Sequence, residues 1–167
     1  DKVSSKKILI TGATGYIGGS LCNGLEKLGF DITRGSRSPP LRRNSLHKWI
    51  STDWDDRSLS FLSNFDCVLH AAGPTSQECG DNPELAKYFY GDVTTKLIEA
   101  LVKQSEKSIF LLSSVHVYSS NGSGVITEET NPSNTHPYAA YRRQSEDLLN
   151  SYLEKNQING CILRLGN

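Results

Sequence analysis

Three glycines have a spacing that suits the binding of a phosphate group. Gly12, Gly15 and Gly18 lie between an apolar segment, residues 8–11, and a stretch with helical periodicity. In that context the first glycine permits a tight turn, the second lets phosphates approach bare backbone, and the third lets strand and helix pack closely. The helix N-terminus adds free N–H groups and a partial positive charge. We expect the pyrophosphate of a dinucleotide here, rather than a plain glycine-rich turn, bound by Gly12, Gly15, Tyr16, Ile17 and Gly18.

A hydroxyl, a phenol and a guanidinium form a second group that could do chemistry. Tyr138 and Arg142 stand one helical turn apart, so their side chains can meet on one face of a helix. A phenol with a pKa of about 10 is a poor base at neutral pH unless a nearby cation stabilises the phenolate. Ser114 ends an apolar segment twenty-four residues before Tyr138. We expect acid–base chemistry at Tyr138; the alternative is an aromatic stripe of Tyr138, Tyr141 and Tyr152 that packs the helix against a partner.

The elements that must position these residues alternate between strands and helices. Apolar bursts and helical periodicity follow one another from end to end, which is typical of parallel strands joined by crossover helices. We therefore expect an α/β fold, a doubly wound parallel sheet with helices on both faces, whose strand ends border the site. The expected strands are residues 8–11, 30–34, 49–50, 67–72, 108–112 and 161–163, the expected helices residues 17–28, 55–63, 85–103 and 138–154, and the longer loops residues 73–83 and 119–137.

Charge and hydropathy exclude several classes of protein. The 167 residues contain 18 Lys and Arg against 18 Asp and Glu, so bulk charge gives no reason to expect binding to nucleic acid or to an anionic membrane. Apolar residues, 37% of the chain, are scattered between charges, and we expect no transmembrane helix. Residues 1–7 are polar and basic, without the hydrophobic stretch of a secretory signal. We therefore expect a cytoplasmic protein.

The cysteines and the missing methionine add two expectations. Cys22, Cys67, Cys79 and Cys161 stand far apart without a CxxC pair, which argues against a zinc or redox motif, and we expect no metal site. Three of them lie in apolar patterns and are expected to be small buried hydrophobes. Because the chain contains no methionine, we expect its numbering to start downstream of the translation start.

The motif TGxxGxxG at residues 11–18 resembles the short-chain dehydrogenase/reductase superfamily. Later residues resemble its extended branch, the NAD(P)-dependent epimerases and dehydratases of nucleotide sugars. The resemblance implies a Rossmann fold and a bound NAD or NADP. It also implies that Asp53 accepts a hydrogen bond from the adenine amino group and that Trp54 contacts the cofactor. The HxAG-like strand end at Ala71, Ala72 and Gly73 is expected to line the cofactor as well. Without the resemblance, Asp53 reads as a carboxylate at a helix start, and His70 as a packed strand residue.

The same resemblance assigns roles to the second group of residues. The family motifs SxxVYG and YxxxK make Ser114 the hydroxyl that orients the substrate oxygen and Tyr138 the general acid/base. Arg142 stands where the family has lysine, and the two are not interchangeable because guanidinium is planar and bulkier. Tyr141 is a weaker candidate, since Ser145, four residues later, brings no charge. Either Arg142 takes over the role of the lysine and acid–base catalysis is retained, or catalysis is weakened while the binding of the cofactor is preserved.

The second strand bears on the choice between NAD and NADP. A site that prefers NAD usually ends this strand with an acidic residue, whereas an arginine accommodates the 2′-phosphate of NADP. Residues 33–38 contain no acid but include Arg34 and Arg37. We therefore favour NADP over NAD, against the alternative that both arginines merely face water.

The extent of the resemblance bears on the organisation of the chain. Residues 90–94 lack the asparagine that the family usually has there, whereas residues 164–167 match its RxxN run. Family members continue for about as many residues again. We expect residues 1–167 to form the NAD(P)-binding Rossmann domain, with the substrate domain absent from this chain. The chain would then be either the cofactor half of a longer enzyme or a naturally short relative.

The function expected from the resemblance is hydride exchange between NAD(P) and a small-molecule substrate, a nucleotide sugar or a similar carbonyl or alcohol. The alternative is a dinucleotide-sensing or interaction module with weakened catalysis. A flavodoxin-like fold that binds another phosphate is disfavoured by Asp53 and by the pairing of Ser114 with Tyr138. The resemblance also suggests a homodimer through the helices at residues 85–103 and 138–154.

Overall fold

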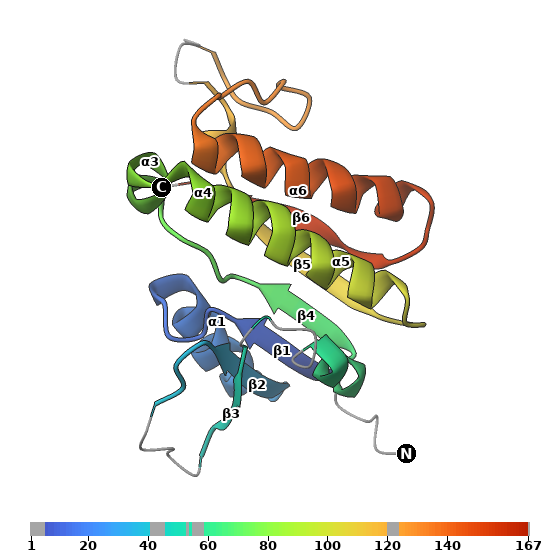
Figure 1. Ribbon diagram of the computed structural model, residues 1–167. Helices are drawn as coiled ribbons and strands as arrows, with labels where there is room; N and C mark the ends of the chain where they lie inside the picture. The colour runs from blue at the N-terminus through green and yellow to red at the C-terminus, as the bar shows by residue number, and fades with distance from the viewer. Residues whose placement is uncertain (1–5, 41–45, 53, 55–58, 120–123, 167) are drawn as a thin grey trace.

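A six-stranded sheet forms the centre of the molecule (Figure 1). The computed structural model describes residues 6–40, 46–52, 54, 59–119 and 124–166. The strands, in order across the sheet, are β3 (Lys48–Ser51), β2 (Asp31–Ser36), β1 (Lys7–Thr11), β4 (Cys67–His70), β5 (Ser108–Ser114) and β6 (Asn159–Leu165), and every neighbouring pair is parallel. The chain order reverses between β1 and β4, which places the expected ligand crevice beyond the carboxyl ends of those strands. The predicted doubly wound α/β fold is confirmed.

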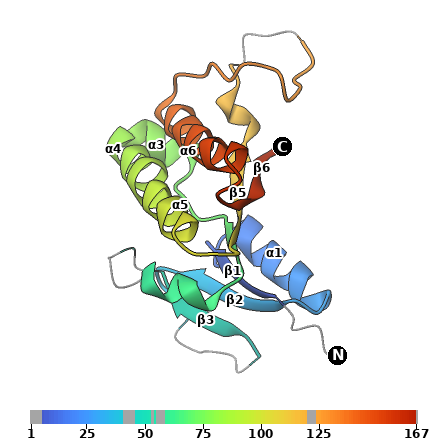
Figure 2. The ribbon, with the colours of Figure 1, turned by 90° about the vertical axis from the view of Figure 1, so that its right-hand side faces the viewer.

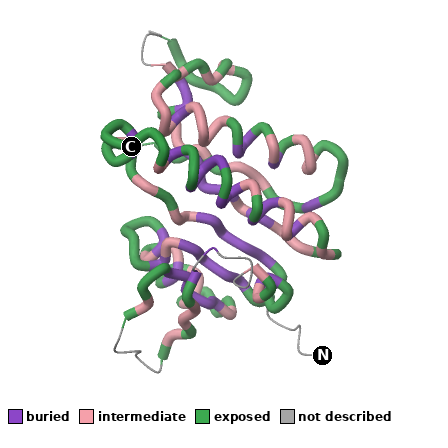
Figure 3. The backbone as a smooth tube through the Cα atoms, in the orientation of Figure 1, coloured by how far each residue is buried: buried purple, intermediate pink, exposed green. Residues whose placement is uncertain are grey.

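Helices cover both faces of the sheet. They are α1 (Tyr16–Lys27), α3 (Ser76–Asp81), α4 (Pro83–Ala86), α5 (Thr94–Val102) and α6 (Pro137–Glu154). Figure 2 shows α1 on one side and α4, α5 and α6 on the other. Side chains of β1 alternate accordingly: Ile8 and Ile10 pack with Cys22 of α1, whereas Leu9 packs with Leu97 of α5. Figure 3 shows that β1 and β4, at the middle of the sheet, are mostly buried.

The long helix predicted for residues 85–103 is interrupted by a wider turn. Residues Lys87–Val93 form a π-helix between α4 and α5. The apolar ladder steps by four residues throughout, which overshoots the 3.6-residue turn of an α-helix. A π-turn has more residues per turn, so Phe89 and Val93 both stay buried in the core. The prediction of one continuous α-helix was therefore wrong in its interior.

Side chains from outside the π-helix satisfy carbonyl groups within it. The Thr94 hydroxyl donates to the carbonyl oxygen of Phe89 at 2.9 Å. The Ser145 hydroxyl, on α6, donates to the carbonyl oxygen of Tyr90. The Ser145 bond holds Tyr90, of which only 4% is exposed, against α6.

Two other predicted segments differ in detail. The loop predicted for residues 73–83 contains α3, because Thr75 and Glu78 form a capping box that starts a helix. The helix predicted for residues 55–63 lies partly outside the described residues, and Ser60–Asn64 forms a 3₁₀ turn. The part of the predicted loop 119–137 that the structure describes contains neither strand nor helix before α6.

A largely buried ion pair joins α6 to β6. The Glu146 carboxylate, with 1% of its side chain exposed, accepts hydrogen bonds from Nε of Arg164 at 3.1 Å and from Nη2 at 2.6 Å. The Glu146 hydrogen bond raises the pKa of the Arg164 guanidinium. Arg164 also donates to the Tyr118 hydroxyl at 2.5 Å. The pair fixes the outer strand of the sheet beneath the helix that carries Tyr138 and Arg142.

No helix in the described part of the chain has the length and apolar character needed to cross a membrane.

Candidate functional site

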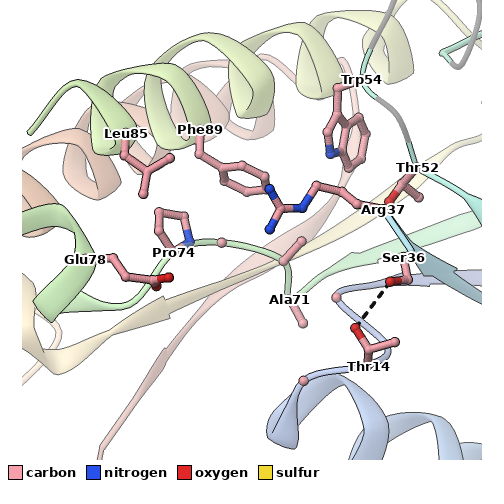
Figure 4. A pocket seen from close by; sticks show the side chains of 14 residues that line it. Thr14, Ser36, Arg37, Thr52, Trp54, Ala71, Pro74, Glu78, Leu85 and Phe89 are labelled. Atoms are coloured by element: carbon pink, nitrogen blue, oxygen red, sulfur yellow. Dashed lines mark hydrogen bonds between the residues drawn. The ribbon is translucent and has the colours of Figure 1, made fainter. Parts of the chain in front are cut away.

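A cavity of about 340 Å³ opens at the carboxyl ends of β1, β2 and β4 (Figure 4). Its volume is within the range of ligand sites. The glycine turn, residues 12–18, forms one wall, and the segment that follows β4 forms the other. The lining residues are Gly12, Thr14, Gly15, Ser36, Arg37, Thr52, Trp54, Ala71, Ala72, Gly73, Pro74, Glu78, Leu85 and Phe89.

The glycine turn is shaped by close backbone contacts. Gly12 has a φ of 69°, and a Cβ atom there would lie 2.8 Å from the Cα atom of Ala72. A Cβ atom on Gly18 would lie 2.7 Å from the carbonyl carbon of Gly12. Gly15 begins α1 without a side-chain cap, and the first turn carries no acidic residue. The turn therefore leaves the positive end of α1 facing the cavity, as a pyrophosphate requires.

Tyr16 and Ile17 do not line this cavity. The two side chains are 92% and 44% exposed at the start of α1. Their contribution to a bound dinucleotide would have to come from backbone N–H groups or from contacts made on binding. Ala71, Ala72 and Gly73 do line the cavity, as predicted from the HxAG-like strand end.

His70 connects the glycine turn to the π-helix. Its Nδ1 atom lies 2.8 Å from the Thr11 hydroxyl, which also accepts from the N–H of Ala72 at 3.2 Å. Its Nε2 atom lies 3.4 Å from the Thr94 hydroxyl, which donates to Phe89. Because Thr94 already donates, His70 must donate from Nε2 and accept at Nδ1.

The His70 ring remains neutral in this chain of hydrogen bonds. Complete burial, and secondarily the charge of Arg142, lower the pKa of His70 to about 3. The ring packs between Trp54 and Phe89, with centroids 5.8 Å from each. His70 therefore holds both walls of the cavity in place, which agrees with its interpretation as a packed strand residue.

The two arginines that favoured NADP lie in different places. The guanidinium of Arg34 pairs with Glu26 at 2.6 Å, donates to Asn23 at 2.8 Å, and is largely buried against α1. Arg34 does not line the cavity, and its guanidinium is paired within the fold, so its position does not support the predicted contact with the cofactor. β2 is longer than predicted, and it ends at Ser36, so that Arg37 follows at the rim. The Ser36 hydroxyl lies 3.2 Å from the hydroxyl of Thr14 (Figure 4).

The residues at the far wall are only partly described. Asp53, the predicted adenine ligand, lies outside the described residues. Trp54 lines the cavity and is 8% exposed. Its Nε1–H group is buried without a hydrogen-bond partner among the described residues. Since buried donors are rarely left unpaired, Nε1 is available to a polar ligand.

Tyr138 and Arg142 meet beside the carboxyl end of β5. The Arg142 guanidinium lies over the Tyr138 ring, 4.6 Å from its centroid. Ser114 ends β5, and its hydroxyl accepts from the N–H of His116 at 3.1 Å. The His116 ring contacts the Tyr138 ring, with centroids 6.2 Å apart. His116 thus lies between the predicted serine and the predicted tyrosine.

Tyr90 also belongs to this group, although no sequence motif pointed to it. Its ring packs edge-on against Tyr138, with centroids 5.5 Å apart. Its hydroxyl accepts from Arg142 at 3.0 Å and donates to the carbonyl oxygen of Pro74 at 2.5 Å. The sequence signal was that segment 90–94 lacks the asparagine usual in the family, and this did not point to Tyr90.

The two groups lie side by side without sharing one cavity. Ser114, Tyr138 and Arg142 are not among the residues that line the 340 Å³ cavity. Three strand spacings separate β2 from β5, or about 14 Å across the sheet. An elongated ligand is needed to reach from Ser36 and Arg37 to Tyr138.

Comparison with known proteins identifies the family. The chain is 25% identical over 173 residues to the ADP-L-glycero-D-manno-heptose-6-epimerase of Brachyspira hyodysenteriae, covering 95% of this chain and 52% of that protein. It is 26% identical to the UDP-glucose 4-epimerase of Bacillus subtilis, in a match that covers 96% of this chain and 52% of that protein. The chain thus spans about half the length of the curated relatives it matches.

A solved structure agrees with these relatives. The UDP-glucuronic acid 4-epimerase of Bacillus cereus, determined in complex with NAD, superposes with a TM-score of 0.82 at 27% identity, over 96% of this chain and 56% of that one. The model of the NAD dependent epimerase/dehydratase family matches residues 8–167. The resemblance seen in the sequence is therefore confirmed, and the chain belongs to the NAD dependent epimerase/dehydratase family.

Proposed function

We propose that this chain is the NAD(P)-binding domain of an enzyme that exchanges hydride with a nucleotide sugar or a similar carbonyl or alcohol. The observation that carries the proposal is the glycine turn at the rim of the 340 Å³ cavity. Added Cβ atoms at Gly12 and Gly18 would meet backbone, so the turn needs glycine at both positions. The Nε1–H of Trp54, which has no hydrogen-bond partner within the described part of the chain, adds a donor for the cofactor. These residues fit a dinucleotide.

The adenosine half is proposed to lie over β2 and the nicotinamide half near β5. The glycine turn, which follows β1, lies between these two strands in the sheet. Its position suits a pyrophosphate that joins the two halves. This orientation also places the reactive end beside Ser114 and Tyr138.

NADP is proposed over NAD because the rim at β2 is basic. Arg37 is exposed beside the Ser36 and Ser38 hydroxyls, and residues 33–38 contain no carboxylate to bind ribose hydroxyls. A guanidinium and hydroxyls suit a 2′-phosphate. Arg37→Ser should weaken NADPH binding about tenfold and change NADH binding little. Equal or stronger binding of NADH by the unaltered chain would refute the preference.

Proton exchange is proposed at the Tyr138 hydroxyl. Bound NAD(P) supplies the hydride donor or acceptor. Tyr138 moves the proton of the substrate hydroxyl, and Ser114 orients the reacting oxygen. Arg142 supplies positive charge from the face of the Tyr138 ring, 4.6 Å from the centroid.

A dinucleotide-sensing or interaction module is the second candidate. The observation that favours it is the fixed guanidinium of Arg142, which is bonded to the carbonyl oxygen of Leu112 at 2.7 Å and to Tyr90. A cation held this way cannot reach the ribose as freely as a lysine on a flexible stem. The cytoplasmic location, the homodimer and the separate substrate domain stay predictions.

Gly15→Asp tests the binding proposal at the start of α1. Gly15 is the N-cap of α1 in extended conformation, where aspartate is a favoured residue, and its added Cβ atom would lie 3.3 Å from Gly12 oxygen. The carboxylate would repel a pyrophosphate at the same N–H groups. Calorimetry with NADPH and NADH should show at least a tenfold loss, on the order of 1.4 kcal/mol.

Gly24→Ala is the matched control for Gly15→Asp. Gly24 lies in the same helix, where an added Cβ atom meets nothing within 4 Å. This variant should bind coenzyme as the unaltered chain does. If the unaltered folded chain binds neither coenzyme, the proposed function is wrong.

A further inference from the structure

The Tyr90 hydroxyl links the cavity wall to the cation of the second group. A phenol can donate one hydrogen bond and accept others. Here the hydroxyl donates to the carbonyl oxygen of Pro74, which lines the cavity, and accepts from Nη2 of Arg142. A continuous path of hydrogen bonds therefore runs from Arg142 through Tyr90 to Pro74.

Arg142 is held on three sides. Its Nη1 atom donates to Leu112 of β5 at 2.7 Å, and its Nη2 atom donates to Tyr90. The guanidinium carbon lies 4.4 Å from the centroid of the Tyr90 ring and 4.6 Å from that of Tyr138. Cations are attracted to the faces of aromatic rings, more strongly where water is excluded. Tyr90 thus contributes both a hydroxyl and a ring face to the position of the guanidinium.

Tyr90 itself has little freedom to move. The π-helix turns it inward, and its carbonyl oxygen accepts from Ser145 of α6. Its ring lies close to Gly73, where an added Cβ atom would lie 2.7 Å from Cε1 of Tyr90. Burial raises the pKa of the Tyr90 phenol above its ordinary value, so the hydroxyl keeps the proton that it donates to Pro74. These contacts fix the position of the Tyr90 side chain.

We propose that Tyr90 is a positioning residue that acts through Arg142, orienting the cation over Tyr138 and coupling it to the cofactor loop at Gly73 and Pro74. The inference rests on the proposed function, because it assigns Tyr90 and Arg142 to the nicotinamide end of a bound coenzyme. Arg142 and Tyr90 then form one unit, in which the lysine-to-arginine replacement is matched by a tyrosine that holds the arginine. Replacing either residue alone should lower the affinity for the coenzyme.

The test compares two ligands on four proteins that form a double-mutant cycle, with a fifth protein as a control. Tyr90→Phe removes the hydroxyl and keeps the ring, and Arg142→Met removes the charge. The two single variants, the double variant and the unaltered chain are each titrated with two ligands. The ligands are NADPH and 2′,5′-ADP, which lacks the nicotinamide half. If NADH binds better, NADH and ADP replace them. Tyr88→Phe is the control, since Tyr88 is in the same π-helix but 53% exposed.

The expected result is selective for the nicotinamide end and depends on Arg142. Tyr90→Phe should lower the affinity for NADPH about fivefold and that for 2′,5′-ADP less than twofold, as the loss of one hydrogen bond to a charged group predicts. In the Arg142→Met background, Tyr90→Phe should have almost no further effect on NADPH affinity. Tyr88→Phe should change neither ligand's affinity.

Three outcomes would overturn the inference while the proposed function stands. They are an unchanged NADPH affinity in Tyr90→Phe, equal losses for both ligands, and a loss that persists in the Arg142→Met background. If the unaltered chain binds no coenzyme, the proposed function fails separately. The thermal unfolding midpoints of the same four proteins then decide whether the pair exists, because additive losses would show that Tyr90 and Arg142 are not coupled.

Discussion

The two parts of the candidate site are built by different means. The glycine turn is shaped by backbone, since Gly12 and Gly18 lie too close to neighbouring main chain for any side chain. The group at β5 and α6 is shaped by side chains, with Arg142 held between the rings of Tyr90 and Tyr138. A site made of backbone needs one residue type at each position, whereas a site made of side chains can be rebuilt by paired replacements.

Acid should affect both parts at once, because His70 joins them. The folded pKa of His70 is about 3 against about 6.5 in an unfolded chain, so only the unfolded chain takes up a proton between these values. Stability from the neutral ring is complete above pH 6.5 and falls as the pH drops toward 3, by about 1.4 kcal/mol per unit and up to about 5 kcal/mol in all.

Denaturant unfolding at a series of pH values measures this loss. His70→Asn should flatten the slope between pH 6 and pH 4, although the variant is less stable at pH 7. His116→Asn, at an exposed position, is the control and should keep the slope of the unaltered chain. A slope unchanged by His70→Asn would assign the acid sensitivity to other groups.

Gly18→Ala should break the backbone-built part alone. The added methyl group would lie 2.7 Å from the carbonyl carbon of Gly12, and neither backbone can move without opening the turn. We expect a loss of about 3 kcal/mol in the free energy of unfolding, as for a severe overpacking. Thermal unfolding measures the loss, with Gly24→Ala as a control that should stabilise α1 by up to about 1 kcal/mol. A loss below about 1 kcal/mol would show that the contact is not tight.

Glu146→Gln should weaken the support of the side-chain-built part. The change leaves Arg164 without its carboxylate partner, although the Tyr118 hydroxyl remains. Breaking a buried pair costs about 3–5 kcal/mol. Because the Arg164 side chain is 24% exposed, we expect about 2 kcal/mol. Affinity for 2′,5′-ADP should stay the same, since its proposed site is over β2; a matching loss of affinity would mean that the two parts of the site are not independent.

The sequence predicted the backbone-built part better than the side-chain-built part. The glycine spacing and the alternation of apolar segments follow from local geometry, and the order of the sheet agreed with both. Arg34 and Arg37 looked alike in sequence, but Glu26, one helix away, pairs with only one of them. Tyr90 was hidden because a periodicity argument cannot foresee the π-turn that aims it at Arg142. Pairings between elements therefore required the structure.

Arg142→Lys should have the smallest effect on affinity. It distinguishes two hypotheses for the side-chain-built part, a matched pair of Arg142 and Tyr90 or a site that has lost its chemistry. A lysine ammonium is compact and cannot present the forked donors that reach both Leu112 and Tyr90. If Arg142 and Tyr90 are a matched pair, the variant should bind NADPH about threefold more weakly, or about 0.7 kcal/mol. The rate of hydride exchange should fall with it. If arginine instead marks a site that lost its chemistry, lysine should raise the rate of exchange. Since both parent and variant keep a cation beside Tyr138, a change in rate reports where the charge is held and not whether it is present.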